Sequence, residues 1–348
     1  MSHSRQKDAA YVTIGQVAQA AGVSKTTISR YISGQYEALA DSTRQRIEET
    51  IAALNYRPNQ LARGLKRGRS NLIGVILADI SNPFSTAIMR GVEDVAKFHG
   101  YSIVVWNTDN DAQKERDYIF IAQSHKIDGL IINTTGQNNA FLRDLGGQKT
   151  PIVLVDRKVP DLNFDTVCTD NRSATETALH YLLEKEYERV ALFTEPVEGI
   201  SSRTERLETF SRILAENGHV STSDVYVVDA HNQAHLEKNL LQFLYDSRGQ
   251  LRTILAGNGV LLLKLSRTFQ RLGIRVPESV SYLGFDDPEW ALLVGSGITT
   301  IAQPTYQIGV VAMNRIILRI GQEDGLTPEI VELPGELIVR GSTPGKMT

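Results

Sequence analysis

The pattern of apolar and polar positions divides the chain into a short helical segment and a much longer alternating body. Between residues 11 and 56, apolar side chains recur three or four positions apart, which is the spacing of a helix that buries one face. From Asn71 onward, short apolar runs of strand length alternate with stretches of helical periodicity. The pattern therefore predicts a small all-α head followed by an α/β body.

The head is predicted to contain three short helices. The first begins at the capping box Thr13-Ile14-Gly15-Gln16 and ends before Gly22, which supplies the permissive backbone that a tight turn needs. Ser24 can cap the second helix, and a further capping box, Ser42-Thr43-Arg44-Gln45, predicts the start of the third. Two short helices joined by a glycine turn indicate a helix-turn-helix unit.

The polar face of the second helix carries side chains suited to reading DNA. Lys25 and Thr26 lie in its first turn, and Ser29 and Arg30 follow one turn later. In a recognition helix such side chains contact base edges in the major groove, where Lys and Arg bind guanine. A solvated helix face has the same composition, but residues 1–70 hold 11 of the 37 Lys and Arg and only 5 of the 40 Asp and Glu. A basic head on an acidic body favours nucleic-acid binding.

Residues 58–70 are predicted to form a hinge. Pro58 prevents the third helix from continuing, and residues 59–69 contain four basic residues, no acidic residue and few apolar anchors, among them Leu65. A helix this short, with Gly64 inside it, is marginal in water, so we expect it to need a partner to become ordered. A plain flexible linker is the alternative interpretation.

The body contains two series of buried strands separated by helices. The strands are expected at residues 72–78, 102–106, 129–132 and 152–155 in the first series, and at 190–194, 225–228, 253–256 and 280–285 in the second. Helical stretches at 85–99, 176–185 and 260–272 lie between strands. This alternation predicts two lobes, each a doubly wound parallel sheet with helices on both faces.

The head and hinge contain two distinctive runs. One is ungapped from Thr13-Ile14-Gly15-Gln16-Val17-Ala18 to Ile28-Ser29-Arg30, and the other is Leu54-Asn55-Tyr56-Arg57-Pro58-Asn59 with Leu61-Ala62-Arg63-Gly64-Leu65-Lys66. Both resemble the corresponding runs of the lac repressor/galactose repressor (LacI/GalR) family of bacterial transcription regulators. The resemblance implies a DNA-binding domain at 11–57, a hinge at 58–70 and a periplasmic-binding-protein-like body at 71–340. Within the body it implies lobe one at about 71–168 and 302–330, and lobe two at about 169–301 and 331–340.

The resemblance also implies how the head and hinge meet an operator. In this family the hinge folds on DNA and inserts a leucine into the minor groove, which kinks the duplex. Leu65 matches that leucine and Lys66 the adjacent basic residue. The candidate DNA-binding residues are Thr13, Ser24, Lys25, Thr26, Thr27, Ser29, Arg30, Asn59, Leu65 and Lys66.

Candidate ligand-binding residues follow the predicted strands of the body, because ligands of open α/β sheets lie beyond the carboxyl ends of strands. The resemblance adds Arg206 as an effector-contacting arginine, with Asp286 as its acidic partner. It also places Phe84 and Ser85 at the cleft, although Phe84 could equally be a core residue. The candidate effector-binding residues are Asp79, Phe84, Ser85, Arg157, Arg206, Asn258 and Asp286.

The chain departs from the family pattern at two positions near the cleft. Gly259 stands where family members often carry Asp, and Ala230 where several relatives carry a stacking aromatic residue. Both departures favour an open-chain or acidic ligand, and two arginines converging on the cleft would suit a carboxylate. The runs 80–84 and 155–157 are most similar to those of regulators of ketogluconate or 2-keto-3-deoxygluconate use.

A neutral sugar is the alternative ligand. It would fit if the carboxylates near the strand ends neutralise the arginines through salt bridges, the candidates being Asp79, Asp156 and Asp286. In two further alternatives, the protein senses a nucleobase or a protein partner instead of a sugar.

The chain lacks the sequence signatures of several common enzyme classes. No dinucleotide fingerprint, phosphate-binding loop, zinc-protease helix or nucleophile elbow is present, so we expect no enzyme, cofactor or metal. His231 and His235, four residues apart, are interpreted as a solvated helix face. The single cysteine, Cys168, excludes an intramolecular disulfide and is expected to be a small buried residue. No apolar run suits a signal peptide or a membrane span, so we expect a cytoplasmic protein without membrane contact.

The sequence thus predicts a homodimeric transcriptional repressor of carbohydrate or sugar-acid catabolism genes. It would bind a pseudopalindromic operator in double-stranded DNA, under the control of a small carbohydrate or sugar-acid effector held between two lobes. A cytosolic sugar-processing enzyme is the remote alternative. No long heptad pattern follows Ile338, so a coiled-coil tetramer is not expected.

Overall fold

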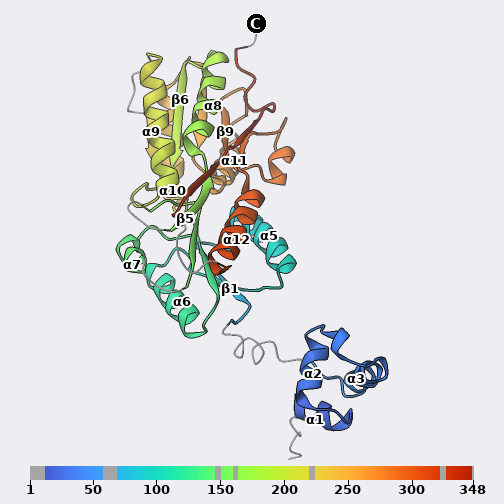
Figure 1. The fold of residues 1–348 in the computed structure, drawn as a ribbon. Helices are drawn as coiled ribbons and strands as arrows, with labels where there is room; N and C mark the ends of the chain where they lie inside the picture. The colour runs from blue at the N-terminus through green and yellow to red at the C-terminus, as the bar shows by residue number, and fades with distance from the viewer. Residues whose placement is uncertain are drawn as a thin grey trace, which may run out of the picture. The chain divides into compact units, whose positions relative to one another are not determined.

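The computed structural model describes residues 12–57, 69–145, 150–159, 164–218, 224–321 and 327–346, which divide into two compact units after Ser70. The unit that ends at Ser70 is helical, and the unit that begins at Asn71 contains both sheets (Figure 1). The predicted fold class, a helix-turn-helix head with a two-lobe α/β body, is confirmed.

The head contains α1 (Ile14–Ala20), α2 (Lys25–Ile32), a short 3₁₀ turn (Tyr36–Ala38) and α3 (Asp41–Ala53). The predicted caps are present at the first two helices: Thr13 and Gln16 form a reciprocal capping box, and Ser24 Oγ accepts from Thr27 N at 3.1 Å. The helices pack around five buried residues, which are Val17, Ala18, Ala21, Ile28 and Ile47.

The predicted capping box at residues 42–45 is wrong. The chain is still extended at Ala40, which occupies the N-cap position, and the first helical residue of α3 is Asp41. Ser42 therefore already lies within the first turn, where its hydroxyl cannot take the place of the N-cap side chain. The negative charge of Asp41 in this first turn favours the helix end through the macrodipole.

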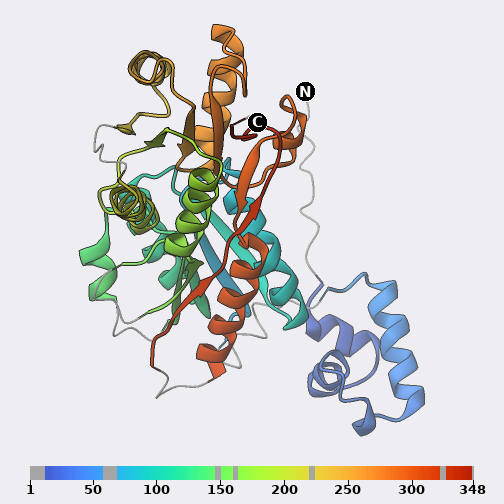
Figure 2. The ribbon, with the colours of Figure 1, turned by 90° about the horizontal axis from the view of Figure 1, so that it is seen from above.

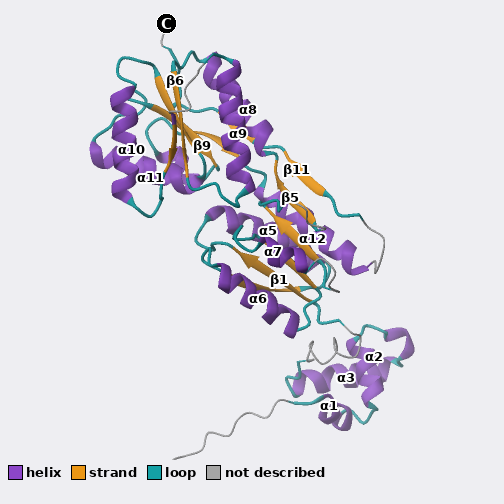
Figure 3. Cartoon of the chain, turned by 90° about the vertical axis from the view of Figure 1, so that its left-hand side faces the viewer, coloured by secondary structure: helices purple, strands orange, loops and turns teal. Residues whose placement is uncertain are grey.

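The first lobe is a six-stranded parallel sheet in the order β11-β5-β4-β3-β1-β2. Its strands are β1 (Leu72–Leu77), β2 (Ser102–Asn107), β3 (Gly129–Ile132), β4 (Ile152–Val155), β5 (Asp165–Thr169) and β11 (Ile330–Leu333). Its helices are α5 (Pro83–Phe98), α6 (Ala112–Ser124), α7 (Asn139–Asp144) and α12 (Thr305–Gly321). The side chains of α5 and α12 pack in one core cluster and those of α6 and α7 in another, so helices cover both faces of the sheet (Figure 3).

The second lobe repeats this arrangement, with the strand order β12-β10-β9-β8-β6-β7. Its strands are β6 (Arg189–Thr194), β7 (Val225–Val227), β8 (Arg252–Ala256), β9 (Ser281–Phe285), β10 (Thr299–Ala302) and β12 (Glu336–Ile338). Its helices are α8 (Asn171–Glu184), α9 (Ser201–Glu216), α10 (Gln233–Asp246) and α11 (Gly259–Leu272), with a 3₁₀ turn at Glu289–Leu293. Strand β12 pairs antiparallel with β10, while the other pairs of this sheet are parallel.

The chain passes between the lobes three times, after β5, after β10 and after β11. Figure 2 shows the last passage in red, from the first lobe toward the C-terminus in the second. The predicted return to lobe two at about residue 331 comes too early, because β11 still pairs with β5 in the first sheet. The apolar pattern of the sequence did not predict four of the strands, namely β5, β10, β11 and β12. They contain polar residues among the apolar ones or are only three or four residues long.

Helices α5 and α12 cross at a pair of glycines. A Cβ added at Gly91 would lie 2.1 Å from the carbonyl oxygen of Tyr306, and one added at Gly309 would lie 2.1 Å from that of Ile88. The two backbones therefore approach more closely than any side chain would permit. This contact holds α12, which arrives from the second lobe, against the first sheet.

Replacing Gly91 by Ala should destabilise the body, although Ala is the better helix former by about 1 kcal/mol. The added methyl group forces α5 and α12 apart, and overpacking of this kind costs about 1–3 kcal/mol. Urea unfolding followed by circular dichroism measures the change in the free energy of unfolding. Gly321→Ala is the matched control, because Gly321 ends the same α12 with open space around it. Equal effects of both substitutions would contradict the close crossing.

Candidate ligand cleft and nucleic-acid-reading helix

A polar cavity of about 120 Å³ lies between the two lobes, at the carboxyl ends of their strands. The first lobe lines it with Ala78, Asp79, Asn82, Phe84, Ser85, Asn110, Asn133, Asp156 and Arg157. The second lobe and the crossing after β10 line it with Glu195, Ile200, Ser202, Arg203, Arg206, His231, Asn258, Val260, Asp286 and Gln303. The cavity therefore brings together all seven predicted effector residues.

The two lobes present matching aspartates to the cavity. Asp156 follows β4 and Asp286 follows β9, and both adopt the left-handed backbone region, with φ of 68° and 73°. Each main-chain N–H donates to the neighbouring strand at 2.9 Å, to Val167 and Ile301 respectively. This backbone region costs an Asp less than it costs most residues, and here it directs two carboxylates from opposite lobes toward one space.

Arg206 on α9 is a fixed, buried cation. Its side chain donates from Nε to Asn171 Oδ1 at 2.9 Å, from Nη1 to the Gly257 carbonyl at 2.6 Å and from Nη2 to Gln303 Oε1 at 3.0 Å. The guanidinium stacks 3.5 Å above the ring centroid of Phe285. Burial lowers the pKa of Arg206 to about 10, so the group remains charged at neutral pH.

Arg157 faces the same cavity from the first lobe. It is 9% exposed, and its Nη1 donates to the Thr134 carbonyl at 2.6 Å. Its Nε is buried and makes no hydrogen bond among the described residues, although it forms an ion pair with Asp156 Oδ2 at 3.5 Å. Burial lowers the pKa of Arg157. A buried donor without an acceptor is costly, so this arginine is suited to an acceptor brought by a ligand.

The carboxylates around the cavity already have donors. Asp286 Oδ2 accepts from Gly259 N at 3.0 Å and Oδ1 from Gln303 Nε2 at 2.6 Å. Burial raises the pKa of Asp286, and nearby Arg206 opposes this rise. Glu195 Oε2 accepts from both Arg203 at 2.7 Å and Asn258 at 2.6 Å.

The head exposes the predicted reading face of α2. Lys25, Thr26, Ser29 and Arg30 are exposed, and on the opposite side of the helix Ile28 is fully buried in the core of the head. The helix begins at the cap formed by Ser24, whose hydroxyl also bonds Thr27 Oγ1 at 2.9 Å. The predicted contacts Asn59, Leu65 and Lys66 lie outside the described residues.

Both parts of this geometry match one family of regulators. Residues 13–59 match the bacterial regulatory proteins of the lacI family, and residues 70–338 match the periplasmic binding proteins and sugar binding domain of the LacI family. The chain belongs to the LacI family. This confirms the resemblance found in the sequence.

Relatives of this LacI-family protein match it along nearly their whole length. It is 43% identical over 338 residues to the HTH-type transcriptional regulator KdgR of Bacillus subtilis, covering 97% of this chain and 99% of that protein. It is 45% identical over 336 residues to the HTH-type transcriptional regulator PtxS of Pseudomonas aeruginosa, covering 95% and 96%. The chain is therefore a DNA-binding transcriptional regulator, and the prediction that it is not an enzyme agrees with these relatives.

Solved structures share the fold. The lac repressor dimer bound to operator and the anti-inducer ONPF superposes with a TM-score of 0.83 at 24% identity, over 96% of this chain and 99% of that chain. A complex of the transcriptional regulator CelR with cellobiose superposes with a TM-score of 0.68 at 24% identity, over 95% and 99%.

The structure explains the two departures from the family pattern. A Cβ at Gly259 would lie 2.6 Å from Asp286 Oδ2, so glycine permits the Asp286 carboxylate to turn back onto the start of α11. Ala230 is 3% exposed within the core of the second lobe, and its neighbour His231 lines the cavity instead. The interpretation of His231 and His235 as one helix face is wrong, because α10 begins only at Gln233.

Sequence reasoning missed Asn133 and Gln303, two polar residues that line the cavity. Asn133 directly follows β3 and Gln303 directly follows β10, so the rule of strand ends applies to both. Asn133 could have been found from the sequence, because strand β3 was predicted. Gln303 could not, because strand β10 was not predicted. Phe84 was predicted either to lie at the cleft or to be a core residue. It does both, because it lines the cavity and also packs in the core.

Two further kinds of site, a reactive cysteine and a metal centre, are not found among the described residues. Cys168 is buried, as predicted, and burial raises the pKa of its thiol to about 12. Across the described ranges, no three His, Cys, Asp or Glu side chains form a group able to hold a metal ion. Within the same ranges, no helix is long and apolar enough to cross a membrane.

Proposed function

We propose that this LacI-family regulator is a cytoplasmic, homodimeric repressor of sugar-acid catabolism genes, and that its effector is a small sugar acid bound in the cavity between the lobes. The observation that carries the acid assignment is the pair of buried guanidiniums, Arg157 from the first lobe and Arg206 from the second, at one cavity. A guanidinium fork binds a carboxylate in two parallel hydrogen bonds.

The partners of the two arginines favour an acid over a neutral sugar. The three hydrogen bonds of Arg206 go to amide and carbonyl oxygens, which leave its positive charge uncompensated by direct contact. The cavity's carboxylates instead accept from other donors: Asp79 Oδ1 accepts from Ser81, Glu195 from Arg203, and Asp286 from Gln303. Arg157 alone faces a neighbouring carboxylate, at 3.5 Å. Asp286 and Asp156 act on Arg206 only from a distance, so a carboxylate ligand would supply the directly bonded counter-charge that this buried cation lacks.

The remaining lining residues suit the hydroxyl groups of such a ligand. Asn133, Asn258 and Asp286 offer acceptor oxygens or amide donors from both lobes. A ligand that contacts both lobes stabilises the arrangement in which they lie close together. Because it binds that arrangement more tightly than an open one, it shifts the population of the two and thereby the operator affinity.

The base-reading residues we propose are Lys25, Thr26, Ser29 and Arg30, with Thr13, Ser24 and Thr27 at the helix starts positioned for phosphates. For the hinge we retain the contacts inferred from the family resemblance, with Leu65 as the minor-groove wedge and Asn59 and Lys66 beside it. Two heads would read the two halves of a pseudopalindrome.

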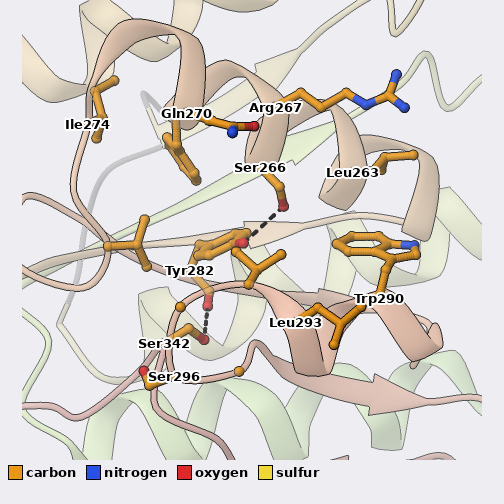
Figure 4. A pocket seen from close by; sticks show the side chains of 15 residues that line it. Leu263, Ser266, Arg267, Gln270, Ile274, Tyr282, Trp290, Leu293, Ser296 and Ser342 are labelled. Carbon is orange, nitrogen blue, oxygen red and sulfur yellow. Dashed lines mark hydrogen bonds between the residues drawn. The ribbon is translucent and has the colours of Figure 1, made fainter.

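The dimer, we propose, uses an apolar face of the second lobe. A hollow of about 510 Å³ lies between α11 and the 3₁₀ turn, and Figure 4 shows Trp290 and Leu293 beside Leu263 on its wall. On this turn Leu292 is 61% and Leu293 84% exposed. A twofold-symmetric contact would cover these side chains on both copies at once.

Sugar acids should bind more tightly than the matching neutral sugars. Isothermal titration calorimetry would compare gluconate, 2-ketogluconate and 2-keto-3-deoxygluconate with glucose. Arg157→Met should weaken acid binding about 10- to 100-fold, because hydrogen bonds to charged groups contribute about 1.5–3 kcal/mol. Arg172→Met, at an exposed ion pair with Glu208, is the control and should leave affinity unchanged. A preference for glucose would refute the sugar-acid assignment.

Base reading is tested on the recognition helix. Arg30→Ala or Lys25→Ala should cost about 1–3 kcal/mol on an operator selected from a random-sequence pool, and much less on random DNA. Fluorescence anisotropy titrations at one salt concentration measure both. Arg46→Ala, an exposed arginine on α3, should have little effect on the difference between operator and random DNA. Equal losses on both DNAs for Arg30 and Lys25 would identify phosphate contacts instead.

The dimer face is tested by placing a charge on it. Leu293→Asp should shift the protein from dimer to monomer in sedimentation velocity and weaken operator binding, because a buried carboxylate without a partner is costly. Leu241→Asp, at a 51% exposed leucine on α10, should remain dimeric. A dimeric Leu293→Asp variant would place the interface elsewhere.

A further inference from the structure

The lobes touch each other outside the cavity, where a loop of the first lobe meets the start of α9. A Cβ at Gly136 would lie 2.4 Å from the Gly199 carbonyl oxygen, and a Cβ at Gly199 would lie 2.5 Å from that of Gly136. Both glycines have positive φ, at 79° and 76°. The two backbones are thus in direct contact, and no other residue type would fit at either position without displacing the partner loop.

Lys158 extends this contact along α9. Its main-chain N–H donates to Ser201 Oγ at 2.7 Å, and its Nζ donates to Glu205 Oε1 at 2.6 Å. A second carboxylate, Glu332 on β11 of its own lobe, accepts from Nζ at 2.5 Å. Burial lowers the pKa of Lys158, but the hydrogen bonds to the two carboxylates outweigh this and raise it, so the ammonium group stays charged.

The ion pair between the lobes is well shielded from solvent. The side chains of Lys158 and Glu205 are 19% and 9% exposed. Exposed ion pairs contribute little because water and salt screen them, whereas a partly buried pair is screened much less. Opening the lobes would separate these two charges and expose both.

The same carboxylate connects to the arginine of the cavity. Glu205 Oε2 accepts from Asn171 Nδ2 at 3.2 Å, and Asn171 Oδ1 accepts from Arg206 Nε at 2.9 Å. Asn171 lies just after the first crossing between the lobes. Lys158 and Glu205 themselves do not belong to the cavity lining described above. The Lys158–Glu205 pair is therefore placed to act on the position of Arg206 without contacting a ligand there.

We propose that Lys158 is a latch between the lobes: its ion pair with Glu205, beside the Gly136–Gly199 contact, holds the closed arrangement and so sets effector affinity from outside the binding cavity. A ligand that requires the closed arrangement binds with an apparent affinity proportional to the fraction of closed molecules. Lys158 is thus a positioning residue for the effector, and its effect on affinity rests on the proposed function.

The latch is tested first without any effector, by measuring the distance between the lobes. Spin labels on Arg116→Cys in α6 and Lys238→Cys in α10 report the separation by double electron–electron resonance, with labelled chains diluted in unlabelled ones so that each dimer carries one pair. Cys168 stays unlabelled, because it is buried and its thiol pKa is about 12. Lys158→Met should move the distance distribution toward longer separations, and Lys158→Arg, which keeps the cation, should restore it.

A matched control and a second variant keep this test decisive. Lys114→Met removes an ion pair of the same length, Lys114–Asp109 at 2.6 Å, that lies within the first lobe, and should leave the distances unchanged. Gly199→Ala should open the lobes by a steric route that is independent of charge. Distances in Lys158→Met identical to those of the unsubstituted chain would overturn the latch.

Measuring effector binding distinguishes a failure of the latch from a failure of the proposed function. Lys158→Met should weaken binding of the tightest sugar acid about three- to tenfold, because it lowers the fraction of closed molecules. Unchanged affinity would overturn the role of the latch in binding. If the unsubstituted chain binds no sugar acid, the proposed effector class is wrong, while the distance measurement still decides the latch.

Discussion

The burial of the Arg206 guanidinium is the constraint around which the body is organised. A cation removed from water is tolerated only when its donors are satisfied, and the acceptors of Arg206 come from several parts of the chain. Asn171 follows the first crossing between the lobes, Gln303 lies in the second, and Gly257 follows β8. The cation is therefore hydrogen-bonded to two of the segments that connect the lobes, and it lines the cavity between them.

Under the proposed function, this arrangement would couple ligand binding to the shape of the body. The acceptors of Arg206 are neutral oxygens, so they orient the guanidinium without cancelling its charge. A ligand carboxylate would complete the site, and its contacts with both lobes would favour their closed arrangement. Such differential binding is what an allosteric regulator requires. The same network reaches Glu205 and the lysine of the first lobe, so the groups that hold the lobes and the group that faces the ligand share hydrogen bonds.

Glycines set the distances of closest approach in three places. Gly91 and Gly309 allow α5 and α12 to cross, Gly136 and Gly199 allow the lobes to touch, and Gly259 allows Asp286 to reach the start of α11. In each case a Cβ would overlap a backbone or carboxylate oxygen of a distant segment. Gly199 lies just before α9, which carries Arg206, and Gly259 begins α11 beside Asp286, so these contacts help to fix two charged side chains of the cavity.

The sequence by itself determined the helix-turn-helix head, the alternation of strands and helices in the body, and the polar residues that follow the predicted strands at the cleft. Local signals sufficed for these, because capping boxes, apolar periodicity and polar residues after strands depend on neighbours within a few positions. Phe84, Ser85 and Arg206 were placed at the cleft by the family resemblance instead. The start of α3 was missed because the extended chain at Ala40, not a side chain, decides where that helix begins. Strands β5, β10, β11 and β12 were missed because their pairing partners, not their own composition, make them strands. Only the tertiary structure could place Gln303 and His231 in the cavity, join Lys158 to Glu205, and show which carboxylates face the arginines. Those relations connect residues far apart along the chain, and they depend on the three crossings that bring the lobes together.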